Sequence, residues 1–195
     1  MGDTARGHSD LASAFARIED KNALAWAVLD SKSEKVVTSA IALAANRRAG
    51  RRVAVPELKH MDLVFLRGGG GAFTERIGTA YQAKAAYLCD FTEARIRRRH
   101  PYVGSILNTD FPKLRRYCTE YQVERSAGVF YLFEVSDPTK QIKYGTTRHV
   151  AIREALGVIV GEVAGNLVFS SVIDCGEADG STVKIHMLVF EPFGP

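Results

Sequence analysis

Three polar residues flank a glycine run, and their types and spacing suit metal-assisted chemistry. Asp62 precedes the run Gly68–Gly71, and Gln82 and Lys84 follow it two residues apart. If the flanking segments are paired strands, side chains two residues apart point to the same face. We therefore expect Asp62 and Lys84 on adjacent strands, on one face, with Gln82 beside them. Such a set suits phosphodiester hydrolysis: oxygen ligands hold Mg²⁺ or Mn²⁺ while a lysine orients the attacking water or stabilises developing charge.

The glycine run is expected to connect the two strands of a hairpin. Residues 61–66 and 79–88 have the apolar and β-branched composition of strands. A phosphate-binding loop would need a helix directly after the glycines and a Lys-Ser or Lys-Thr pair at its mouth. The sequence Ala72–Arg76 offers neither, so the hairpin interpretation is preferred.

The elements around this hairpin indicate an α/β (α+β) domain with a mixed central sheet flanked by helices. The chain has 195 residues, of which 46% are hydrophobic and 25% charged, which suits one compact domain over residues 1–195. Thr109 or Asp110 is the expected cap of a helix that follows the hairpin. The apolar run 128–135 is expected to be a central strand buried on both faces. The other expected elements are helical stretches over 9–29 and 34–48, a strand at 53–55 and a hairpin within 166–193.

This order of elements resembles the PD-(D/E)xK nuclease superfamily, whose core is restriction-endonuclease-like. The resemblance covers about residues 10–135 and leaves a C-terminal helix and β-hairpin extension at about 136–195. It implies that Asp62 and Gln82 are metal ligands and that Lys84 is catalytic with them. The expected activity is Mg²⁺-dependent hydrolysis of DNA by an endonuclease. Gln82 stands where the family usually has an acid, so we expect weaker metal binding.

An upstream acid often completes such sites, and the sequence leaves its identity open. Glu57 lies before the first strand of the hairpin, and Glu19 lies on the first expected helix. Glu57 is the preferred third metal ligand. His60, two residues before Asp62, would point to the same face and line the cleft.

Arginine clusters predict a polyanionic partner, which we take to be DNA. The net charge is +4 and the isoelectric point is near 9.0. Arg97, Arg98, Arg115 and Arg116 are the expected contacts to the phosphate backbone, although Arg115 and Arg116 fit a solvated helix face equally well. Three scattered cysteines, no signal peptide and no bilayer-length apolar stretch favour the cytoplasm and no membrane partner. The sequence leaves homodimer formation open.

Two alternatives remain. The same fold, weakened by Gln82, would serve as a non-catalytic module that binds nucleic acid or protein. The second alternative is a GIY-YIG-type nuclease in the C-terminal half, which residues 126–156 resemble loosely. That resemblance is carried by Gly128–Tyr131, Lys143–Gly145 and Arg153, with Glu162, Glu177 or Glu191 as the implied metal ligand.

Overall fold

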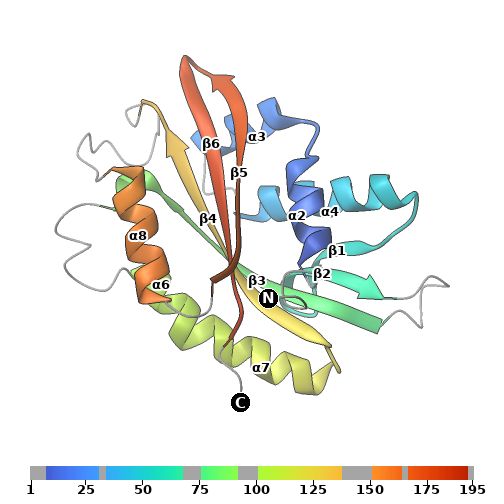
Figure 1. Ribbon diagram of the computed structural model, residues 1–195. Coiled ribbons are helices and arrows are strands. Elements are labelled where there is room, and N and C mark those ends of the chain that lie inside the picture. The colour runs from blue at the N-terminus through green and yellow to red at the C-terminus, as the bar shows by residue number, and fades with distance from the viewer. Residues whose placement is uncertain are drawn as a thin grey trace.

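A six-stranded mixed sheet with helices on both faces forms the core of the protein (Figure 1). The computed structural model describes residues 8–30, 34–67, 76–91, 101–137, 151–163 and 167–192. The strand order is β1-β2-β3-β4-β6-β5, and only the β3–β4 pair is parallel. The predicted α/β (α+β) class, with a mixed central sheet flanked by helices, is confirmed. The strands are β1 (Ala54–Leu58), β2 (Met61–Arg67), β3 (Arg76–Tyr87), β4 (Arg125–Val135), β5 (Leu167–Ala178) and β6 (Ser181–Phe190).

The helices divide into two layers, one on each face of the sheet, as the blue and the green-to-orange ribbons in Figure 1 show. The first layer is α2 (Ser9–Ala16), α3 (Lys21–Asp30) and α4 (Glu34–Ala49). After the short η1 (Leu88–Asp90), the second layer is α6 (Pro101–Ser105), the π-helical turn η2 (Ile106–Asp110), α7 (Phe111–Glu120) and α8 (Ile152–Glu162).

Strand β4 separates the two hydrophobic cores. Tyr131 and Phe133 point into the core under α2, α3 and α4, whereas Phe130 and Leu132 point into the core under α6, α7 and α8. All four are fully buried. The prediction of a central strand buried on both faces is therefore confirmed.

The helical stretch expected over residues 9–29 is two helices. Helix α2 ends at Ala16 and α3 begins at Lys21. Asp20 accepts a 3.0 Å hydrogen bond from the backbone N–H of Ala23, so a side-chain cap starts a new helix there. Glu19 consequently lies in a connection rather than on a helix.

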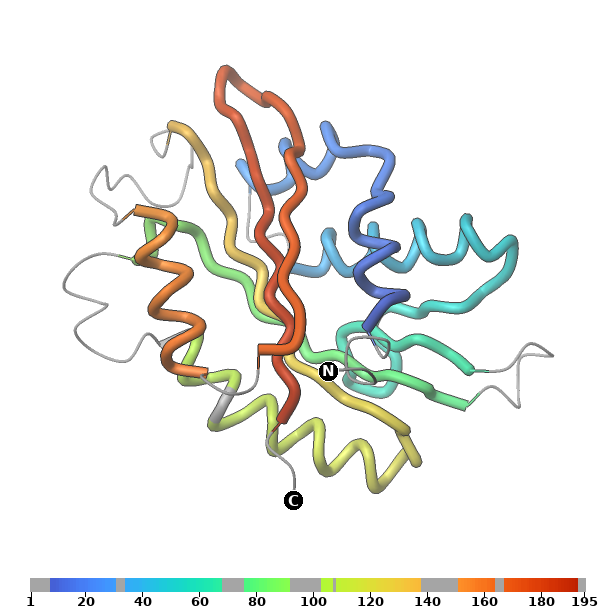
Figure 2. Tube along the Cα trace, in the orientation of Figure 1, coloured from blue at the N-terminus to red at the C-terminus, as the bar shows by residue number. Residues whose placement is uncertain are grey.

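Strand β3 extends beyond the end of its pairing with β2, so one edge of β3 is not paired with a strand there (Figure 2). The β2–β3 register runs from Arg67↔Arg76 to Leu63↔Tyr81, while β3 continues beside β4 as far as Tyr87. Beyond Tyr81 the backbone N–H groups on that edge face side chains instead. Ala83 donates to Asp62 Oδ2 over 2.7 Å, and the backbone N–H of Ala85 lies near the carboxylate of Glu34 and favours its charged form.

A glycine lets the second helical layer approach the sheet where η2 meets α7. A Cβ atom added to Gly128 on β4 would lie 2.9 Å from Phe111 Cε1 and 3.3 Å from Ile106 Cγ2. Real Cβ atoms do not come as close as 2.9 Å to another carbon, so the Phe111 ring or the helix that carries it would have to move.

Gly128→Ala is therefore expected to lower the free energy of unfolding by about 1–3 kcal/mol, the usual cost of overpacking. Urea denaturation measures this. Gly157→Ala is the matched control, because it lies inside α8 with nothing within 4 Å of the added Cβ. That change is expected to stabilise the protein by up to about 1 kcal/mol through helix propensity. Equal effects of the two substitutions would contradict the close packing at Gly128.

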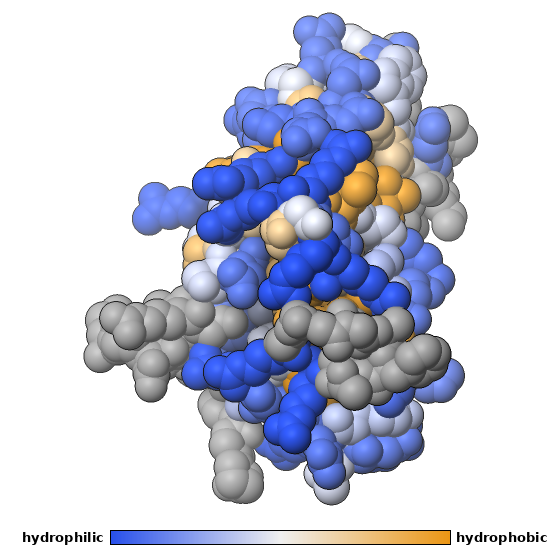
Figure 3. Space-filling model, turned by 90° about the vertical axis from the view of Figure 1, so that its right-hand side faces the viewer, coloured by the Kyte–Doolittle hydropathy of each residue, from blue (hydrophilic) through white to orange (hydrophobic). Residues whose placement is uncertain are grey.

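Figure 3 shows one face of the molecule, on which hydrophilic side chains surround a smaller hydrophobic area. Val36 and Leu43 on α4 are 43% and 50% exposed. Within the described ranges, none of the helices has both the length and the apolar character needed to cross a lipid bilayer. Cys89, Cys118 and Cys175 form no disulfide bonds.

Candidate functional site

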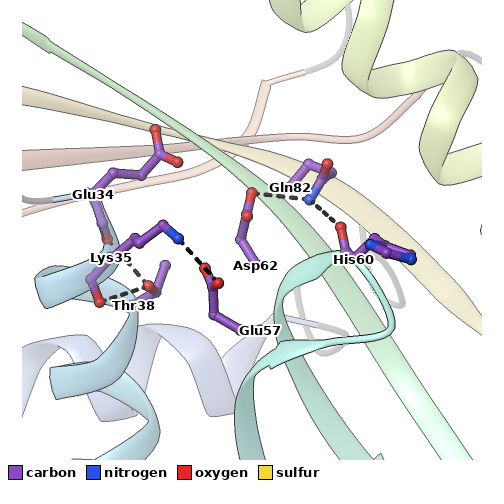
Figure 4. A network of polar contacts seen from close by, with 7 residues as sticks. All are labelled: Glu34, Lys35, Thr38, Glu57, His60, Asp62 and Gln82. Carbon is purple, nitrogen blue, oxygen red and sulfur yellow. Dashed lines mark hydrogen bonds and ion pairs between the residues drawn. The ribbon is translucent and has the colours of Figure 1, made fainter.

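Glu57, Asp62 and Gln82 form one row across β1, β2 and β3. The pairs Pro56↔Leu63 and Leu58↔Met61 place Glu57 opposite Asp62, and the pair Leu63↔Tyr81 places Asp62 opposite Gln82. Figure 4 shows Asp62 between Gln82 on one side and Glu57 on the other. Two carboxylates directly opposite each other on paired strands repel, so this row keeps an unfavourable charge pair.

Gln82 donates hydrogen bonds to Asp62 in this structure. Its Nε2 lies 2.9 Å from Asp62 Oδ2 and 3.2 Å from the carbonyl oxygen of His60. Both neighbours are acceptors, so the amide nitrogen must face them, and the amide oxygen points away from Asp62 (Figure 4). The predicted partnership of Asp62 and Gln82 is present, but Gln82 supplies a donor there rather than the expected oxygen ligand.

Lys84 lies on the same strand face as Gln82, on the strand adjacent to Asp62. Its ammonium attracts the carboxylate of Asp62 and so opposes the rise in the pKa of Asp62 that burial causes. The side chain is 29% exposed, so packing does not seal it. Nζ lies 3.5 Å from Oδ2 of Asp110, a buried acid at the end of η2. The Lys84 side chain is thus partly exposed to solvent and is also ion-paired with Asp110.

Glu34, at the first position of α4, is the acid that the sequence interpretation missed. The backbone N–H of Ala85, at the open edge of β3, lies near the Glu34 carboxylate, which also interacts with the charges of Lys84, Asp62 and Asp110. Burial, reinforced by Asp62 and Asp110 and opposed by Lys84, raises its pKa to about 7. An acid in the first turn of a helix normally complements the helix dipole, so its position in the sequence pointed to a structural role.

The raised pKa of Glu34 predicts a specific pH dependence of stability. The folded state keeps this proton up to about pH 7, whereas the unfolded chain loses it near pH 4.5. Folded protein thus binds more protons in that window, and its stability falls as the pH rises through it. Relative to Glu34→Gln, the wild type is expected to lose at most about 3 kcal/mol between pH 4.5 and 7, with no further loss above.

Urea denaturation at pH 5 and pH 8 with EDTA present tests this expectation. Glu154→Gln is the matched control, since Glu154 occupies the first turn of α8 and is exposed. A stability difference between the wild type and Glu34→Gln that is the same at both pH values would contradict the perturbed pKa.

The upstream acids named from the sequence have other partners. Glu57, in a left-handed conformation with φ 55°, forms a 3.1 Å ion pair with Lys35 of α4. It remains close enough to Asp62 to raise the pKa of that carboxyl. Glu19 pairs with Arg47 near the other end of α4, 2.5 Å away.

His60 belongs to a tight turn and not to a strand face, contrary to the sequence interpretation. Lys59 and His60 link β1 to β2, both with positive φ, at 50° and 68°. Two such residues are typical of a two-residue hairpin connection. His60 reaches the site through its carbonyl oxygen, which accepts from Gln82, and its side chain is exposed.

The predicted phosphate contacts are described only in part. Arg115 and Arg116 are exposed on α7, and the Arg116 guanidinium lies 5.2 Å from the ring centre of Tyr117. Arg97 and Arg98 lie outside the described residues.

For the GIY-YIG alternative, Lys143–Gly145 also lies outside the described residues. Tyr131 is fully buried in the core and cannot touch a phosphate from there, while Arg153 is exposed on α8. Among the described residues, Tyr131 is therefore not placed at a surface site as this alternative requires.

The oxygen atoms at the open edge of β3 are of the type that a hard cation prefers, but in this structure they are not arranged to hold one. Glu34 and Asp62 offer the carboxylate oxygens that Mg²⁺ prefers, and their mutual repulsion raises the pKa of Glu34. Across the described residues, no three Asp, Glu, His or Cys side chains are already arranged to hold a metal ion. Comparisons of the chain with protein-family models, curated proteins and solved structures find no match.

Proposed function

We propose that the protein is a Mg²⁺-dependent DNA endonuclease that hydrolyses phosphodiester bonds at the open edge of β3. The observation that carries this proposal is the meeting of Glu34, Asp62 and Lys84 at one place, from α4, β2 and β3. Two acids and one accessible ammonium are the groups that metal-assisted phosphodiester hydrolysis needs. The order of a helix, an antiparallel strand meander, a helix and a parallel strand also supports the resemblance to the PD-(D/E)xK superfamily.

In this proposal Asp62 and Glu34 would hold Mg²⁺ or Mn²⁺, and Gln82 would add its oxygen after its amide turns. The bound metal would neutralise charge on the phosphate and lower the pKa of a water molecule. Lys84 would orient that water or stabilise the charge that develops on the phosphate. Ala83 fixes the carboxylate of Asp62 through its backbone N–H group.

The proposed substrate is DNA, and the proposed compartment is the cytoplasm. The positive net charge and the exposed Arg115 and Arg116 support a polyanionic substrate. The three cysteines form no disulfide bonds, which is consistent with a reducing compartment. All the site residues come from one chain, so the chemistry does not require the homodimer that the sequence leaves open.

Incubation of the protein with supercoiled plasmid tests the proposal. Nicked or linear product is expected with Mg²⁺ or Mn²⁺ and none with EDTA. Equal amounts of product with metal and with EDTA would contradict it.

A second function, a non-catalytic binding module of the same fold, is favoured by two contacts. Gln82 donates to Asp62, and Asp110 pairs with Lys84, so each group of the site already has a partner within the protein. Plasmid binding without cleavage under either metal would favour this module.

A further inference from the structure

Asp110 is a buried acid whose hydrogen-bonding capacity is unused. It is 1% exposed, and neither carboxylate oxygen has a hydrogen-bond partner among the described residues. Burying a carboxylate without hydrogen bonds is unfavourable for folding. Although the sequence interpretation named Asp110 as a candidate cap of α7, its side chain makes no capping hydrogen bond. The fold therefore keeps a costly acid here for a reason other than helix capping.

The backbone around Asp110 is built to place it. The π-helical turn η2 interrupts the helical run between α6 and α7 and ends at Asp110. Such turns occur frequently at functional sites, since the wider turn redirects a side chain. The following residue, Phe111, packs on Gly128, where no side chain keeps it away from the sheet. These two features bring the carboxylate of Asp110 down onto β3.

Lys84 lies where Asp110 points, between acids from both helical layers. Its Nζ is 3.5 Å from Asp110 Oδ2, which belongs to the α7 side of the sheet, whereas Glu34 comes from α4 on the other side. A lysine has a flexible four-carbon stem and a strongly hydrated head. Without a fixed partner, this ammonium would turn toward Glu34 and Asp62 or toward water.

We propose that Asp110 is a positioning residue that holds the ammonium of Lys84 away from Glu34 and Asp62, so that these two carboxylates stay available to a cation. This proposal rests on the nuclease function proposed above for the same site. Asp110 touches neither substrate nor metal in this assignment. It acts only through Lys84.

Asp110→Asn keeps the shape of the side chain and removes its charge. We expect little change in the thermal midpoint, because the loss of the ion pair with Lys84 is offset by the removal of a buried charge without hydrogen bonds. We expect kcat for plasmid cleavage to fall about 10- to 100-fold, the usual effect of misplacing a group near the chemistry. KM for DNA should change by less than about twofold. Asp110→Glu restores the charge and should recover part of kcat, and Asp30→Asn, at an exposed position, is the control.

A second measurement does not depend on cleavage. The ¹H–¹⁵N signal of the Lys84 side chain, assigned with Lys84→Arg, reports an ammonium held in an ion pair. The signal is expected in the wild type and in Asp30→Asn and is expected to be lost in Asp110→Asn. A missing signal in the wild type, or an unchanged one in Asp110→Asn, would overturn the proposal. If no variant cleaves DNA, the nuclease function fails, while this signal still decides whether Asp110 holds Lys84.

Discussion

Lys84→Ala is expected to lower the rate of plasmid cleavage by about 100- to 1,000-fold, the loss typical of removing one donor that stabilises transition-state charge. The Kd for DNA should change by less than about twofold. Lys84 is 29% exposed and contributes one of the 26 Lys and Arg residues of the chain, so its share of backbone attraction is small. The two effects separate because charge develops on the phosphate during the reaction, whereas binding uses the ground-state phosphates.

Single-turnover cleavage and a fluorescence binding titration at one salt concentration measure both quantities. Lys21→Ala, an exposed lysine at the start of α3, is the matched control. Cleavage by Lys84→Ala at the wild-type rate would show that the site is assigned wrongly. Absence of cleavage in every variant with either metal would favour the binding module.

The parts of the site that sequence reasoning found are those that local periodicity governs. Asp62, Gln82 and Lys84 lie on two consecutive strands, and the glycine run between these strands lies outside the described residues. Alternation of side chains across paired strands then puts them on one face without any knowledge of the remaining chain. The structure joins Asp62 directly to Gln82 and lets Lys84 act on the same carboxylate.

The parts that were missed depend on tertiary packing. Glu34 comes close to β3 because β2 stops pairing after Tyr81 and leaves the edge of β3 near Ala85 open to the first residue of α4. No periodicity in the sequence marks the point where two strands separate.

Asp110 was missed for a related reason. Its direction depends on a π-helical turn and on the missing side chain of Gly128, whereas an acid followed by Phe-Pro resembles an ordinary helix cap in the sequence. For His60 the prediction was wrong in the opposite sense. The side chain was expected on the strand face beside Asp62, but Lys59 and His60 have positive φ and form a tight turn.

Gln82→Glu is expected to make the stability of the protein depend on metal. The new carboxylate would face Asp62 Oδ2 and the His60 carbonyl oxygen, which now accept from Nε2 over 2.9 and 3.2 Å. Three acceptors would then meet, and of these Asp62 Oδ2 would keep a donor, the backbone N–H of Ala83. We expect the free energy of unfolding in EDTA at pH 8 to fall by about 1–3 kcal/mol, the cost of unsatisfied buried polar groups.

Mg²⁺ should reverse this loss, because a cation bound to the folded state alone stabilises it in proportion to its occupancy. The rise in thermal midpoint on adding Mg²⁺ should therefore be larger for Gln82→Glu than for the wild type. An added charged ligand also strengthens binding of a hard cation, so the Mg²⁺ concentration for half-maximal cleavage should fall by about tenfold. Gln122→Glu, at an exposed turn, is the matched control and should change neither quantity. A Gln82→Glu protein that Mg²⁺ stabilises no more than it stabilises the wild type would remove Asp62 and Gln82 from any metal site, whether or not the protein cleaves DNA.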